Sequence, residues 1–235
     1  FLWWQFALGH EIERSVPNTD GTWIPVLGHT LQLYLHMLAW LGSAWLAHRL
    51  ALPTRPRPWF IAATPPWLSL PIMLAVATQG ALSLHNVFEV WGWLVWPLAL
   101  VLHFATLKQV DRLAPQRWWS WVHTGGVWLL VLLAGNLLVW AVQQAQLQGT
   151  AWASVIYLVA SVVVLLGLAQ ASLYVPQGRM RDSWPLDRFA YAYLWRAAMP
   201  LAVMVALGAL LVAVYSDGNA KPLPYVPLLN PTDIT

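Results

Sequence analysis

Residues 152–174, WASVIYLVASVVVLLGLAQASLY, contain no charged side chain. A helix needs roughly 20 mostly apolar residues to cross the hydrocarbon core of a bilayer, which is about 30 Å thick. Other stretches meet the same description, and they cover approximately residues 26–47, 66–84, 90–107, 121–142 and 197–215. Lipid-exposed backbone must satisfy its own hydrogen bonds, and these stretches lack the apolar–polar alternation of a barrel strand. The sequence therefore predicts an all-α, polytopic bundle with about six transmembrane helices.

The composition agrees with a chain whose main solvent is lipid. Of 235 residues, 59% are hydrophobic and 9% are charged, whereas a soluble domain carries about 25% charged residues. The net charge is only +3 and the basic residues lie in short loops, so the clustered basic face of a nucleic-acid-binding protein is not expected. Cysteine is absent, which excludes disulfides, thiolate metal sites and cysteine nucleophiles.

The loops between the apolar stretches alternate in charge. Residues 48–58, 108–117 and 176–196 hold every Lys and Arg of the chain except Arg14 and Lys221. An excess of Lys and Arg marks the cytoplasmic side of a multi-pass protein. We therefore expect these loops to be cytoplasmic and both ends of the sequence to be extracytoplasmic, in a bacterial cytoplasmic (inner) membrane.

The two ends indicate an internal piece of a longer polytopic protein. Residues 1–9, FLWWQFALG, are typical of the last turns of an earlier apolar helix, and residues 230–235, NPTDIT, form no polar tail. Residues 1–235 are accordingly predicted to be a single membrane-embedded region.

Histidines are the candidate cofactor ligands. They are His29, His36, His85, His103 and His123. Two of them, His29 and His36, are seven residues apart and share a helical face. The pairs His29 with His85 and His103 with His123 lie at matching predicted depths, as haem or metal ligation across a bundle requires. Neutral histidines also hydrogen-bond neighbouring helices, and this interpretation is favoured. We expect no cofactor, with haem binding as the alternative.

Uncharged polar residues within the predicted spans are candidates for helix packing or for a polar track through the bundle. These residues are Gln32, Gln79, Asn136 and Gln170. Packing is favoured, since such side chains hydrogen-bond across helix interfaces. If a track exists, Gln79 and Asn136 are the first residues expected to line it.

Catalytic and metal-binding motifs are missing from the sequence. It contains no Ser-His-Asp pattern, no HExxH and no paired carboxylates, so no catalytic residue and no metal site are predicted. One enzymatic hypothesis stays open: a membrane enzyme acting on lipid-linked substrates, with Glu11, Glu13 or Glu89 as acid or base.

Residues 179–196, RMRDSWPLDRFAYAYLWR, mix arginine with aromatic residues. This mixture is typical of an interfacial stretch lying against anionic lipid. An ordinary cytoplasmic loop is the other interpretation, and the sequence leaves both open.

Short motifs carry a family resemblance. They are SDG at 216–218, PLPYVPLLNP at 222–231, GWLVWPLAL at 92–100 followed by His103, and WPL at 184–186. In these motifs the chain resembles a family of very large predicted bacterial membrane proteins that is grouped only under a domain of unknown function. Thr232 departs from the pattern, where Leu is expected before Asp233. The resemblance implies further helices on both sides and supplies no catalytic residues.

These observations predict a non-enzymatic component of the membrane, acting in transport, as a channel-like protein or in envelope assembly. The expected partners are the lipid bilayer, the rest of the same polypeptide and other membrane subunits, with no nucleic acid. The alternatives are a haem-binding redox protein that uses the histidines and the membrane enzyme described above.

Overall fold

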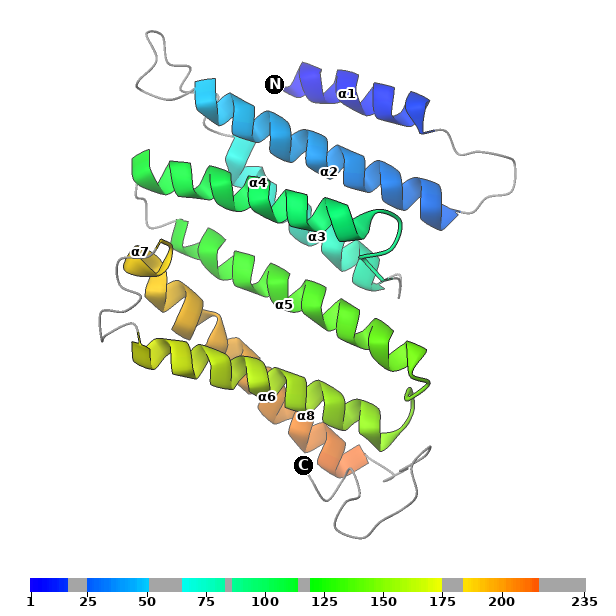
Figure 1. Cartoon of the computed structure of the whole chain (residues 1–235), viewed down its shortest axis with the longest axis vertical. Helices are drawn as coiled ribbons and strands as arrows, with labels where there is room; N and C mark the ends of the chain where they lie inside the picture. Colours follow the sequence, from blue (N-terminus) through cyan, green and yellow to red (C-terminus); the bar gives the residue numbers. More distant parts are fainter. Residues whose placement is uncertain (17–24, 51–64, 83–85, 114–118, 175–183, 216–235) are drawn as a thin grey trace. The chain divides into compact units, whose positions relative to one another are not determined.

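The computed structural model describes residues 1–16, 25–50, 65–82, 86–113, 119–174 and 184–215 (Figure 1). These residues are almost entirely helical and include no strand, which confirms the predicted all-α class. The elements are α1 (Leu2–Ser15), α2 (Pro25–Leu50), η2 (Pro65–Leu68), α3 (Ser69–Leu82), α4 (Gly92–Leu113), α5 (Trp119–Gln144), α6 (Ala151–Tyr174), α7 (Leu186–Ala190), η3 (Tyr191–Arg196) and α8 (Ala198–Tyr215). The short element η2 is a 3₁₀ turn, and η3 is a π-helical segment.

Four helical segments within the described ranges are long and apolar enough to cross a membrane. They cover Gly92–Asp111, Trp119–Gln144, Ala151–Leu173 and Arg188–Tyr215. Two of the expected spans, 26–47 and 66–84, are not among them. The helix α2 has 26 residues, but polar side chains such as Gln32 and His36 dilute its apolar character. The helix α3 has 14 residues, which is shorter than the roughly 20 that a span needs.

Two helices extend further than their apolar stretches predicted. The helix α4 continues to Leu113, so Lys108 and Asp111 are helical residues, although we expected a loop at 108–117. Residues 186–196 were expected to belong to the loop 176–196, but they form α7 and η3, which lead into α8. Helical backbone satisfies its own hydrogen bonds, and long basic side chains can extend to water. A helix therefore need not end where its apolar run ends.

The described chain divides into two compact units. The first comprises Phe1–Trp119 and Leu129–Asn136. In it α2 packs against α1, α3 and α4, and it lies between α1 and α4 in Figure 1. The buried face of α2 is formed by Tyr34, Met37, Leu41 and Ala44, whose spacing of three or four residues places them along one side of a helix.

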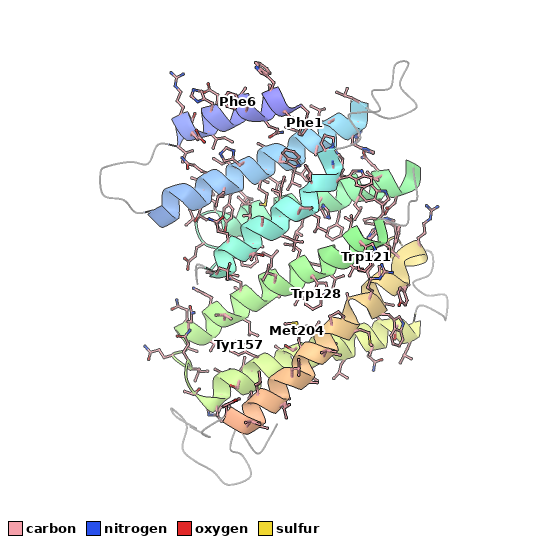
Figure 2. All side chains as sticks on the ribbon, turned by 180° about the vertical axis from the view of Figure 1, so that it is seen from behind. Phe1, Phe6, Trp121, Trp128, Tyr157 and Met204 are labelled. Atoms are coloured by element: carbon pink, nitrogen blue, oxygen red, sulfur yellow. The ribbon has the colours of Figure 1, made fainter. Side chains whose placement is uncertain are left out.

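The second unit comprises Ser120–Trp128 and Leu137–Thr235. Its described helix α6 packs against α8 and η3. Leu201 is the one buried residue found in α8, and apolar side chains such as Met204 (Figure 2), Leu207 and Leu211 are exposed on it. A helix that is apolar on all sides is typical of a membrane span, so lipid or further helices must cover this surface.

Candidate functional site

Polar side chains of the first unit converge on the turn between α3 and α4. The buried residue Val87 lies in this turn. The Tyr34 hydroxyl of α2 donates a hydrogen bond to the Val87 carbonyl oxygen at 2.6 Å. The Val87 N–H donates to Oδ1 of Asn136, on α5, at 2.9 Å. Two helices thus satisfy both backbone groups of one non-helical residue, as buried backbone in an apolar medium requires.

Two glycines make room for this turn. A Cβ atom added at Gly80 would lie 2.5 Å from Cγ1 of Val87, and one added at Gly92 would overlap the Val87 carbonyl oxygen. The turn itself contains positive φ angles at Val90 (46°) and Trp91 (69°). A β-branched residue rarely adopts such an angle. The same turn thus combines unfavourable backbone angles at Val90 and Trp91 with side-chain hydrogen bonds to Val87.

A second set of polar contacts joins α1 to α2. Nε2 of Gln32 donates to the Val16 carbonyl oxygen at 2.7 Å, at the end of α1. The indole N–H of Trp4 donates to the Ser43 hydroxyl at 3.1 Å. A Cβ atom added at Gly9 would lie 3.2 Å from Cε1 of His36. Gln32 caps a helix terminus in this arrangement.

The second unit encloses His123 among aromatic side chains. The imidazole is fully buried. Its Nδ1 lies 2.8 Å from the Tyr193 hydroxyl. The ring stacks on Phe189, with centroids 4.0 Å apart and planes at 25°. It makes an edge-to-face contact with Trp184, with centroids 6.0 Å apart. Aromatic residues from the 184–193 segment thus surround a histidine of α5.

The π-helical segment η3 is joined to α5 by a threonine. In η3 the Ala197 N–H donates to the Ala192 carbonyl oxygen at 3.2 Å, five residues earlier. The Thr124 hydroxyl lies 3.3 Å from the same oxygen and 3.0 Å from the Ser120 carbonyl oxygen. Segments of this kind occur frequently at functional sites because they displace side chains from regular helical positions.

Arg196, the last residue of η3, contacts the beginning of α5. Its Nη1 donates to the Ser120 hydroxyl at 2.8 Å. Its Cζ lies 4.3 Å from the ring centroid of Trp121 and 5.4 Å from that of Tyr191. Figure 2 labels Trp121 at this end of α5. The guanidinium is therefore held by one hydroxyl and two aromatic rings.

His48 is a buried titratable residue that the sequence did not identify. It lies just beyond the expected span 26–47, and neither ring nitrogen has a hydrogen-bond partner in the described part of the chain. Burial, assisted by the charge of Arg49, lowers the pKa of His48 below its usual value. This environment therefore favours the neutral form of the imidazole.

The histidines proposed as haem ligands are distributed as follows. His85 and the His29 side chain lie outside the described part of the chain. His36 lies against α1, His103 is buried in α4 of the first unit, and His123 belongs to the second unit. A search of the described residues finds no group of three or more His, Cys, Asp or Glu residues that could hold a metal ion.

The remaining candidates occupy different environments. Asn136 and Gln32 bind backbone groups as described above, whereas Gln79 and Gln170 are exposed on α3 and α6. The carboxylates proposed for an enzyme, which are Glu11 and Glu13 on α1 and Glu89 in the α3–α4 turn, are exposed as well.

Sequence reasoning missed the contacts of Tyr34 and Tyr193 and the burial of Asp111 at the end of α4. A tyrosine within an apolar run is itself a usable signal, because a buried hydroxyl requires a partner. Asp111 carried no such signal, since its position suggested a loop.

A family model described as "Predicted membrane protein (DUF2339)" matches residues 2–235, and the chain belongs to this family. The resemblance noted from the short motifs is thereby confirmed. No curated protein and no solved structure matches the chain.

Proposed function

We propose that this DUF2339 protein is a non-enzymatic, multi-pass scaffold of the bacterial cytoplasmic membrane that serves in envelope assembly. Its working parts are packed helices rather than a solute path or a catalytic centre. The observation that supports this proposal is the use of Tyr34 and Asn136 to hold the backbone of Val87.

A polar track must exchange hydrogen bonds with water or solute as they pass. Oδ1 of Asn136 is bonded to the Val87 N–H, and Nε2 of Gln32 is bonded to the Val16 carbonyl oxygen. Withdrawing either group would leave a backbone group unsatisfied, at a cost of about 1–3 kcal/mol if it is buried. Residues with such partners are better suited to a fixed architecture than to conduction.

The proposal includes about six spans, with both ends extracytoplasmic. In such a bundle α2, with its polar Gln32 and His36, would be covered by neighbouring helices rather than by lipid, as polar residues in membranes usually are. Single cysteines introduced at Ala114 and Gln146 are expected to react with an impermeant thiol reagent from opposite sides. Reaction from the same side would refute this topology.

The partners proposed for the scaffold are the bilayer, the rest of the polypeptide and other membrane subunits. The exposed apolar surface of α6 and α8 supports this part of the proposal, because such a surface requires an apolar neighbour.

Complementation of a deletion strain distinguishes a scaffold from a protein with a polar track through its helices. In each variant strain the amount of protein in the membrane is measured beside the restored phenotype. For a scaffold, Asn136→Leu lowers both together, because it breaks the Val87 anchor, and the control Gln170→Leu, at an exposed residue of α6, changes neither. Loss of the phenotype in Gln170→Leu at an unchanged protein amount would refute the scaffold and favour a polar track.

A further inference from the structure

The guanidinium of Arg196 is fixed in position by three neighbours. The Ser120 hydroxyl accepts a hydrogen bond from Nη1 at 2.8 Å, and the rings of Trp121 and Tyr191 lie 4.3 Å and 5.4 Å from Cζ. An arginine whose guanidinium is already held by its neighbours loses less side-chain entropy when it binds a ligand. We call this group, consisting of Arg196, Ser120, Trp121 and Tyr191, the Arg196 clamp.

Within the part of the chain that the structure describes, the three groups found against the clamp guanidinium are electrically neutral. A hydroxyl and two aromatic rings carry no formal negative charge, and a guanidinium has five N–H donors, of which the bond to Ser120 uses one. The clamp therefore presents a full positive charge and a planar set of donors, which match the oxygen atoms of a phosphate in a bidentate geometry.

Two exposed aromatic rings lie against this charge, and a third exposed aromatic residue precedes it in the chain. Trp121 is 61% exposed, Tyr191 is 64% exposed and the neighbouring Trp195 is 56% exposed. Trp and Tyr favour the headgroup level of a bilayer, where one part of the ring is apolar and another is wet. A free phosphate ion would use only the guanidinium, whereas a phospholipid would also cover the adjoining aromatic surface.

The clamp also lies at the ends of helices that the loop charges predict to be cytoplasmic. The preceding segment supplies Arg179, Arg181 and Arg188 in the sequence. The cytoplasmic leaflet carries anionic lipids, which attract Lys and Arg side chains near its surface.

From these observations we propose that the Arg196 clamp binds the phosphate of an anionic phospholipid in the cytoplasmic leaflet. The guanidinium binds the phosphate oxygens, and Trp121 and Tyr191 lie beside the glycerol and upper acyl chain. The site goes beyond a scaffold role, because it would select one class of lipid.

The test uses the intact protein in dodecylmaltoside micelles, titrated with phosphatidylglycerol and monitored by native mass spectrometry and thermal stability. Phosphatidylglycerol is expected to form a discrete adduct and to raise the unfolding temperature. Arg196→Gln should weaken this binding at least tenfold, and Arg196→Lys, which keeps the charge but not the planar donors, about threefold.

Arg49 offers a matched control. Its Cζ lies 4.7 Å from the Trp45 ring, at the end of α2, and it is also predicted to be cytoplasmic. Arg49→Gln removes the same charge and should leave phosphatidylglycerol binding within twofold of wild type. Equal losses in Arg49→Gln and Arg196→Gln would show general surface attraction and overturn the proposal.

Two further titrations separate the sources of phosphate. Phosphatidylcholine and inorganic phosphate should each stabilise the protein far less than phosphatidylglycerol does. Inorganic phosphate acting as strongly as the lipid would overturn the proposal, as would phosphatidylcholine doing so.

A second variant guards against misfolding of Arg196→Gln. Trp121→Leu alters a mostly exposed ring, so folding should not depend on it. It is expected to weaken phosphatidylglycerol binding about threefold, and wild-type binding in this variant would contradict the clamp.

Discussion

Replacement of Gly92 by alanine should destabilise the first unit through the Val87 turn. The new Cβ would overlap the Val87 carbonyl oxygen and would lie 3.3 Å from the Tyr34 hydroxyl. Both obstacles belong to one buried hydrogen bond, of 2.6 Å, between that hydroxyl and that carbonyl. Because one obstacle is backbone, a rotation of a side chain cannot relieve the overlap.

Two costs contribute to the expected loss of stability. An extra methyl group in a well-packed site costs about 1–3 kcal/mol. Displacement of the Val87 carbonyl weakens its bond to Tyr34, and an unsatisfied buried group costs about 1–3 kcal/mol. The two costs share the same displacement and are not fully additive. The free energy of unfolding should therefore fall by about 2–4 kcal/mol.

Equilibrium unfolding by dodecyl sulfate in mixed micelles, followed by circular dichroism, measures this loss. Gly135→Ala is the matched control, since a Cβ there meets nothing within 4 Å. Alanine in place of a helical glycine should stabilise that variant by about 0.5–1 kcal/mol. If Gly92→Ala were as stable as Gly135→Ala, the anchoring role assigned to the Val87 turn would be wrong.

Three other measurements check separate parts of the structure. Tyr193→Phe removes the hydroxyl bonded to the buried imidazole and should lower the free energy of unfolding by about 1 kcal/mol, measured by the same titration; an unchanged midpoint would contradict the bond. Because burial lowers the pKa of His48, the unfolded state binds a proton more readily than the folded state as the pH falls through about 6.5. The stabilising contribution of His48 is then complete above that pH and decreases below it. The dodecyl sulfate midpoint of unfolding should therefore decrease more between pH 7 and pH 5 in wild type than in His48→Gln. The reduced-minus-oxidised spectrum of the purified protein should be flat; a haem band that disappears in His103→Ala would establish the redox alternative.

The sequence predicted the bounds of the apolar helices closely where contact with lipid determines which residues are apolar. The expected stretches 121–142 and 152–174 correspond to helices Trp119–Gln144 and Ala151–Tyr174. Their apolar residues must lie in the membrane whatever they contact there. The positions of the apolar runs in the sequence are therefore sufficient to predict where these two helices begin and end.

Contacts between distant residues could not be predicted in the same way. Tyr34 and Val87 are 53 positions apart, and Val87 has no polar side chain to mark it. Asn136 was identified as a polar residue within a span. Its partner is a backbone N–H in a turn, and no local sequence pattern predicts the conformation of that turn. His123 was likewise identified without the aromatic residues around it, because those come from residues 184–193.

Polar residues in apolar helices and irregular backbone have a common physical cause here. Asn136 satisfies the Val87 N–H in a turn, and the Thr124 hydroxyl approaches the Ala192 carbonyl oxygen in a π-helical segment. A regular helix offers such a side chain only carbonyl oxygens that already accept a helical bond, as Ser120 does for Thr124, whereas a break leaves backbone groups without a helical partner. In the Val87 turn the side chain and the break stabilise each other, since without Asn136 the Val87 N–H would lose its partner in an apolar medium. An amide side chain within an apolar run, such as Asn136, therefore indicates irregular backbone nearby in space as well as a ligand site or a polar track.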